Sequence, residues 1–197
     1  MRQMRLGFTA ASAIAIACAA PAQAAVLTFN GSATGLGNVT PDAACAPRGR
    51  GIINPATTSG SSTLGAFTYS HTVCTSGPPG GPIDGTFAIN FGSDGFFGTL
   101  SGVTARNATV PTFFDFDIAY SILGGTGRFL GASGAFATGP GSGANINFQP
   151  SRITLNFVNG AINAPAVPEP GTWALLILGF GSVGATMRRR PMQIALA

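Results

Sequence analysis

Apolar and polar residues alternate with a period of two in several stretches of the chain. Phe67, Tyr69 and Val73 alternate with threonine and serine. The same alternation recurs over residues 86–91, 114–120, 145–148 and 153–157. A period of two turns successive side chains to opposite faces, so each stretch is predicted to be a strand with one buried and one wet face.

Glycine-rich turns separate these stretches. Gly92-Ser93-Asp94-Gly95 predicts a hairpin, and residues 77–82 and 139–143 are expected to be loops. Many short strands with frequent turns predict an all-β domain, a small antiparallel barrel or a sandwich. Residues 37–64 are rich in Pro, Gly, Ser and Thr, and we expect a long loop there.

The first residues have the features of a secretory signal peptide. Arginines at the start precede an uncharged apolar run over residues 6–20, and the small residues Ala22 and Ala24 suit cleavage by signal peptidase. The predicted signal peptide is residues 1–24. The run is short for a transmembrane anchor, and lipidation at Cys18, in a poor lipobox, is a competing interpretation.

The last residues form a second targeting segment. Residues 171–187 carry no charge and are followed by Arg188-Arg189-Arg190. At ~1.5 Å per residue the segment would be ~26 Å long, at the short end of what crosses a bilayer. We predict a transmembrane helix with Trp173 near one interface and a basic cytoplasmic tail over residues 188–197. Residues between the two ends would then lie outside the inner membrane.

Prolines punctuate the approach to this segment. Pro165, Pro168 and Pro170 lack the backbone N–H donor and favour extended conformations. Residues 163–170 are therefore expected to be an exposed, Pro-rich linker, and residues 25–162 the exported β-domain.

The C-terminal motifs resemble a known sorting signal. Pro168-Glu169-Pro170, Trp173-Ala174 and the arginine cluster that begins at Arg188 resemble the PEP-CTERM signal of the PEPxxWA type. The resemblance implies recognition by an exosortase, a membrane-embedded cysteine transpeptidase, with processing near the Pro-Glu-Pro motif. It also implies export through the inner membrane, transient anchoring there, and then a cell-surface or extracellular location. Such proteins are typical of bacteria that make exopolysaccharide and biofilm matrix.

A second resemblance concerns the β-domain. Residues 119–134, with Gly124-Gly125-Thr126-Gly127-Arg128-Phe129, resemble a stretch of secreted bacterial β-proteins and the corresponding turn of plant dirigent proteins and allene oxide cyclases. Residues 31–37 fit the start of the bacterial pattern. The resemblance implies an eight-stranded, calycin-like barrel. The shared motifs are glycine turns, so no catalytic residue is carried over.

Charge and cysteine content limit the remaining possibilities. Without the two targeting ends, the domain has five arginines, five aspartates and no lysine, so a nucleic-acid-binding surface is rejected. Cys45 and Cys74 would be in an oxidising compartment, and we predict a disulfide between them, with two free thiols as the alternative. Together with His71 they would still lack the usual fourth ligand of a zinc site.

Two features could carry chemistry. Asp115 and Asp117 lie two apart on a predicted strand, so both carboxylates point the same way. They could serve glycoside hydrolysis or, with Asp94 or Asn90, bind calcium, but a solvated strand face is the favoured interpretation. His71, on the apolar face of its strand and without a nucleophile motif, is expected to be structural.

Three hypotheses for function follow. The first is a non-enzymatic surface or matrix protein that an exosortase delivers, with exopolysaccharide as a candidate partner. The alternative is a small-ligand or glycan-binding β-barrel, because small barrels can hold one ligand. The third is a secreted carbohydrate-active enzyme. We expect no cofactor and name no catalytic residue.

Overall fold

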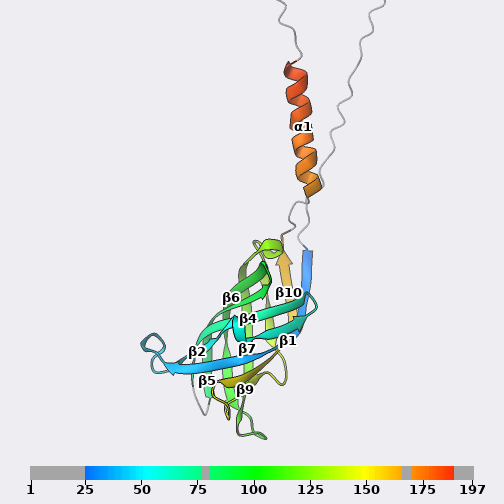
Figure 1. Cartoon of the computed structure of the whole chain (residues 1–197). Helices are drawn as coiled ribbons and strands as arrows, with labels where there is room; N and C mark the ends of the chain where they lie inside the picture. The colour runs from blue at the N-terminus through cyan, green and yellow to red at the C-terminus, as the bar shows by residue number, and fades with distance from the viewer. Residues whose placement is uncertain (1–24, 77–79, 166–169, 189–197) are drawn as a thin grey trace, which may run out of the picture. The chain divides into compact units, whose positions relative to one another are not determined.

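The structure is a computed structural model that describes residues 25–76, 80–165 and 170–188 (Figure 1). These residues belong to two separate bodies, which we describe one at a time. The first is a β-domain within Gln23–Val167, and the second contains one helix after Pro168. The predicted signal peptide, including Ala22 and Ala24, lies outside the described residues.

Most of the β-domain is strand. The strands are β1 (Ala25–Pro41), β2 (Gly49–Ile53), β3 (Ser59–Ser62), β4 (Gly65–Thr75), β5 (Gly80–Phe91), β6 (Asp94–Arg106), β7 (Phe113–Thr126), β8 (Ser133–Thr138), β9 (Gly143–Asn145) and β10 (Ser151–Ala164). Three short 3-10 helices connect them: η1 (Ala43–Cys45), η2 (Pro55–Thr57) and η3 (Gly127–Phe129). The predicted all-β class is confirmed.

The strands form one antiparallel sheet that closes on itself. Neighbours follow the order β2-β1-β3-β4-β5-β6-β7-β8-β10-β9, and β1 also pairs with β10. Strands β2 and β3 both lie between β1 and β4, and β8 and β9 both lie between β7 and β10. The pairing therefore makes a ring of eight strand positions, which we call the closed sheet. Because β1 and β10 pair within a single sheet, the protein does not form the alternative fold, a sandwich of two sheets.

Aromatic side chains fill much of the closed sheet. Phe29 lies at the centre of one cluster, with ring centroids 5.1–5.9 Å from those of Phe67, Phe96, Phe136 and Phe157. These rings are at most 4% exposed, and most meet edge to face, the arrangement that aromatic quadrupoles favour. The alternation seen in the sequence is thus the inward face of the strands.

The expectation of a long loop over residues 37–64 is wrong. Strand β1 continues to Pro41, and β2 and β3 each pair with both β1 and β4. These segments lack large alternating side chains, and their backbone hydrogen bonds to distant strands make them strands. Asn163 and Ala164, which were expected to begin the linker, pair with β1 and belong to the last strand.

The second body contains the helix α1 (Pro170–Arg188). It covers the predicted segment and starts at a proline, which is favourable in the first helical turn. However, none of the helices in the described part of the chain is sufficiently long and apolar to cross a membrane. The structure therefore does not show the expected transmembrane helix. One reason is that Gly179, Gly181 and Gly184 contribute no apolar side chain to the segment.

Candidate functional site

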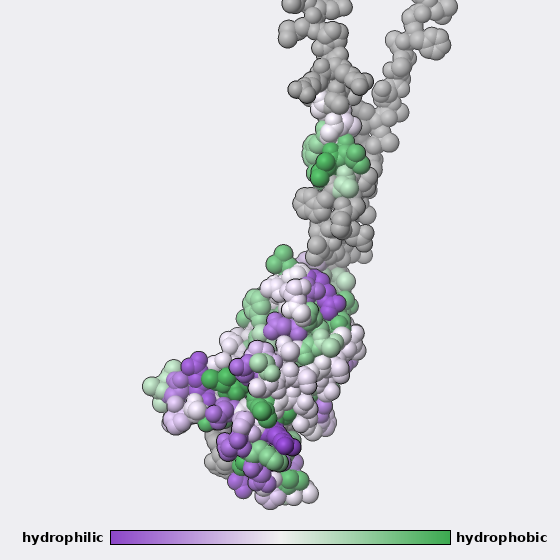
Figure 2. Space-filling view, viewed as in Figure 1, coloured by the Kyte–Doolittle hydropathy of each residue, from purple (hydrophilic) through white to green (hydrophobic). Residues whose placement is uncertain are grey.

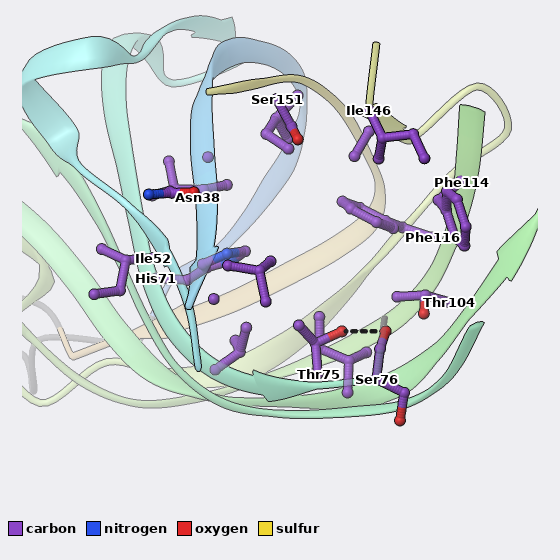
Figure 3. Close-up of a pocket in the computed structure, with 18 residues that line it drawn as sticks. Asn38, Ile52, His71, Thr75, Ser76, Thr104, Phe114, Phe116, Ile146 and Ser151 are labelled. Atoms are coloured by element: carbon purple, nitrogen blue, oxygen red, sulfur yellow. Dashed lines mark hydrogen bonds between the residues drawn. The ribbon is translucent and has the colours of Figure 1, made fainter. Parts of the chain in front are cut away.

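One end of the closed sheet contains an open pocket of about 110 Å³ (Figure 3). All eight strand positions of the ring contribute to its wall. The lining residues are mostly apolar and come from strand ends or the turns beside them: Gly37, Asn38, Val39, Gly51, Ile52, Ile53, His71, Val73, Thr75, Ser76, Ile83, Thr104, Phe114, Phe116, Ala144, Ile146, Ser151 and Ile153. The aromatic cluster around Phe29 does not reach this end, so the interior is filled on one side and hollow on the other.

A polar relay joins the pocket to the core. The hydroxyl of Tyr69 lies 2.9 Å from Nδ1 of His71 and 3.3 Å from the hydroxyl of Tyr120. Both tyrosines are at most 1% exposed, and His71 is 8% exposed. Only His71 of the three lines the pocket, where Figure 3 shows its ring on the wall.

Burial keeps the relay uncharged. Removal from water lowers the pKa of His71 from 6.5 to about 3. The same desolvation raises the pKa of Tyr69 and of Tyr120 above its usual value. At neutral pH the relay therefore consists of a neutral imidazole and two neutral phenols, and it carries no activated nucleophile.

Two threonine hydroxyls of the pocket are used locally. The Thr104 hydroxyl donates to the Gly81 carbonyl at 3.3 Å, and the Thr75 hydroxyl donates to the Ser76 carbonyl at 3.4 Å. None of the described residues that line the pocket is an aspartate, glutamate, lysine or arginine. The pocket is thus an uncharged, apolar space with one histidine in its wall.

The structure contains the disulfide between Cys45 and Cys74. Their Cα atoms are 5.2 Å apart, and the bond ties η1 to β4. Arg48 reinforces the connection, since its guanidinium donates to the Cys74 carbonyl at 3.1 Å and pairs with Asp84. These contacts hold the segment that leads into β2, one wall of the pocket.

The structure brings no third acidic, histidine or cysteine side chain to Asp115 and Asp117 that would complete a metal site among the described residues. Both oxygens of Asp115 accept from the Asn107 amide, at 2.8 and 3.1 Å, so this carboxylate holds the turn between β6 and β7. Asp117 is exposed. Asp94 begins β6, whereas Asp115 pairs with Ala105 near the other end of that strand. Asp94 therefore cannot bind a calcium ion together with Asp115. Among the described residues no cluster of acidic, histidine or cysteine side chains could hold a metal ion.

The residues of the sorting signal are described only in part. Pro170 and Arg188 are the first and last residues of α1, and Trp173 and Ala174 lie in its first turns. Pro168, Glu169, Arg189 and Arg190 lie outside the described residues. Large apolar side chains of α1 are exposed, Leu176, Ile177, Leu178, Phe180 and Val183, and its coloured part is mostly green in Figure 2. At 100° per residue, four of these five positions lie within an arc of about 120°, and Leu178 lies outside it.

Sequence reasoning missed the pocket and the role of the relay. The period-two pattern placed Tyr69 and His71 on the same face, which the structure confirms, and this was the available signal. The pattern did not show that Tyr120, 51 residues after Tyr69, hydrogen-bonds to it, because that contact depends on the tertiary structure.

Comparison with known proteins bears on the C-terminal segment alone. No curated protein and no solved structure matched the chain, so the likeness of the β-domain to dirigent proteins and allene oxide cyclases is not confirmed. Residues 166–190 match the family model described as the PEP-CTERM protein-sorting motif. The motif indicates export and exosortase-dependent sorting to the cell surface. The chain therefore carries a PEP-CTERM protein-sorting motif at its C-terminal end.

Proposed function

We propose that the protein is a non-enzymatic surface protein whose closed sheet is the cargo and whose C-terminal segment is the delivery signal. Signal peptidase removes residues 1–24, α1 keeps the precursor transiently at the inner membrane, and an exosortase processes it near Pro168–Pro170. The matched sorting motif at residues 166–190 is the observation that carries this proposal.

The two bodies of the structure support this division of labour. Pro165 follows the last strand directly, and the helix starts at Pro170, so Pro168 and Glu169 of the Pro-Glu-Pro motif come after the last strand and before the helix in the sequence. Cleavage there would leave every strand of the closed sheet in place. The exposed apolar side chains of α1 need to be covered by lipid or by protein, which fits a helix that a membrane enzyme recognises.

A non-enzymatic role agrees with the chemistry of the β-domain. The relay of Tyr69, His71 and Tyr120 is neutral, and Asp115 is engaged by Asn107. The face of the domain in view in Figure 2 mixes pale, purple and green residues, with green ones in small groups. We propose that this surface contacts the extracellular matrix, with exopolysaccharide as the candidate partner.

The test is the intact mass and cellular fraction of the protein in its host, with and without the exosortase. The expected product lacks residues 1–24 and the segment beyond about Pro168, and its C-terminal processing requires the exosortase. A triple variant, Pro168→Ala, Glu169→Ala and Pro170→Ala, should stay unprocessed. Pro165→Ala is the matched control, because this proline is outside the motif and exposed, and it should be processed normally.

Two results would contradict the proposal. An identical, uncut C-terminus in both strains would show that the segment is not an exosortase substrate in this protein. Recovery of the protein from the cytosol of a strain with intact export would contradict delivery altogether. Loss of matrix association only when exopolysaccharide synthesis is deleted would support the proposed partner.

A further inference from the structure

The hydrogen-bond pattern of the relay determines what His71 presents to the pocket. Tyr120 has one hydrogen-bond partner, the hydroxyl of Tyr69. If Nδ1 of His71 carried the proton and donated to Tyr69, the Tyr69 hydroxyl would donate to Tyr120. The Tyr120 hydroxyl proton would then have no acceptor in a side chain that is 1% exposed, which is costly.

The opposite order gives both tyrosine hydroxyl protons an acceptor. Tyr120 donates to Tyr69, and Tyr69 donates to Nδ1 of His71. In a neutral imidazole the proton is then on Nε2. Nε2 makes no hydrogen bond to the protein. Among the described residues, every side-chain nitrogen that is fully buried has a hydrogen-bond partner, so Nε2 is not fully buried. Nε2–H is therefore accessible, and it is a donor without an acceptor from the protein.

The rest of the pocket restricts its occupant. No described lining residue is charged, and most are aliphatic, phenylalanine or glycine, so a charged ligand would lose hydration without compensation. A sugar ring would bury several hydroxyls against walls that are mostly hydrocarbon and would leave most of these hydroxyls without a partner. The volume of about 110 Å³ is below the ~150 Å³ of an engineered apolar cavity that holds benzene, but this pocket is open at the end of the sheet.

We propose that the open end of the closed sheet binds a small uncharged molecule. An aromatic ring or short hydrocarbon chain of the ligand enters between Ile53, Val73, Phe116 and Ile153, and a carbonyl or ether oxygen accepts from Nε2–H of His71. The relay fixes the tautomer and thereby selects ligands that carry a hydrogen-bond acceptor. This inference does not depend on the sorting signal, and it excludes a glycan as the occupant of the pocket.

His71 is the only histidine of the chain, which makes its imidazole a direct probe. A ¹⁵N–¹H spectrum of the side chain of the exported protein should show the Nε2–H tautomer at neutral pH. The protein is then titrated with acetophenone, which has one ring and one carbonyl, and with ethylbenzene, a molecule of similar shape without an acceptor. We expect acetophenone to shift the Nε2 signal and the amides of the lining residues.

Variants separate the hydrogen bond from the space. His71→Asn places its amide near the former Nδ1 and removes the donor at Nε2, whereas His71→Gln can restore a donor near Nε2. The ratio of acetophenone to ethylbenzene affinity should fall about two- to tenfold in His71→Asn, as expected for one neutral hydrogen bond, and recover in part in His71→Gln. Because both probes fill the same space, a change in pocket size cancels in the ratio.

Ala144→Leu tests the location. Ala144 is 7% exposed and lines the pocket, so the larger side chain should fill it and abolish binding of both probes while the backbone amide spectrum stays that of a folded protein. The proposal is overturned if the Nδ1–H tautomer predominates, if neither probe perturbs the lining residues up to its solubility limit, or if His71→Asn leaves the affinity ratio unchanged. Binding of glucose or another simple sugar at these residues would also overturn it.

Discussion

Acidification should destabilise the β-domain through its buried histidine. Burial lowers the pKa of His71 from 6.5 to about 3, whereas the imidazole of the unfolded chain titrates near its usual value. Between these two pH values the unfolded state binds the extra proton and the folded state does not. The free energy of unfolding therefore falls as the pH decreases through this window, and it is unaffected by His71 above it.

The size of the effect follows from the shift. Each pH unit inside the window costs about 1.4 kcal/mol for one group. At pH 4.5, two units below the usual value, the loss is about 2.7 kcal/mol. Since the stability of a whole domain is about 5–15 kcal/mol, such a loss is readily measured.

Urea unfolding, followed by circular dichroism at pH 7 and pH 4.5, measures this loss in the wild type and in His71→Gln. The variant has its own stability at pH 7, but it lacks the titrating imidazole. Carboxylates titrate in both proteins, including Asp42, whose pKa is lowered by the Ala44 N–H and by Arg50, and they cancel in the comparison. We expect the wild type to lose about 2.7 kcal/mol more than the variant on acidification. Equal losses would refute the assignment of a buried, neutral His71.

Further predictions concern stability, each measured by the same urea unfolding. Replacing both Cys45 and Cys74 by serine should cost roughly 3.5 kcal/mol, because the disulfide closes a loop over a sequence separation of 29 residues; reduction of the wild type should reproduce this, and no change on reduction would argue against the bond. Phe29→Ala should cost roughly 3–5 kcal/mol, since the ring contacts four others and is fully buried, whereas the exposed Leu123→Ala should stay within about 0.5 kcal/mol. Gly98→Ala should cost at least roughly 1–3 kcal/mol, because its Cβ would overlap the backbone of β7; wild-type stability would contradict this close approach.

The fold class could be predicted from the sequence where burial imposes a period. The alternation over residues 114–120 and 67–73 lies within β7 and β4, with the large apolar residues inward. Strands β2 and β3 could not be found in this way. Gly60 of β3 shows why. The Phe67 ring occupies the space that a Cβ at position 60 would need, so β3 packs closely there because it has no side chain, and it leaves no apolar pattern in the sequence.

The candidate site was harder to foresee for a related reason. Its wall takes a few residues from every position of the ring, and these come together only after β1 pairs with β10. The local pattern placed His71 on an inward face, but it could not show that the aromatic cluster around Phe29 leaves one end of the interior open. The sorting motif, by contrast, is a contiguous run of residues, and it could be recognised without any tertiary structure.

The pairing of the first and last strands has a consequence for display of the protein. Ala25 pairs with Ala164, whereas Gly37 of the pocket pairs with Ser151, so both chain ends leave the β-domain at the closed sheet's far rim. About 12 residues of strand, ~40 Å at ~3.3 Å per residue, separate the two rims along β1. A tether attached at either end of the β-domain is therefore joined at the rim opposite the pocket, so its point of attachment does not lie at the open end of the closed sheet.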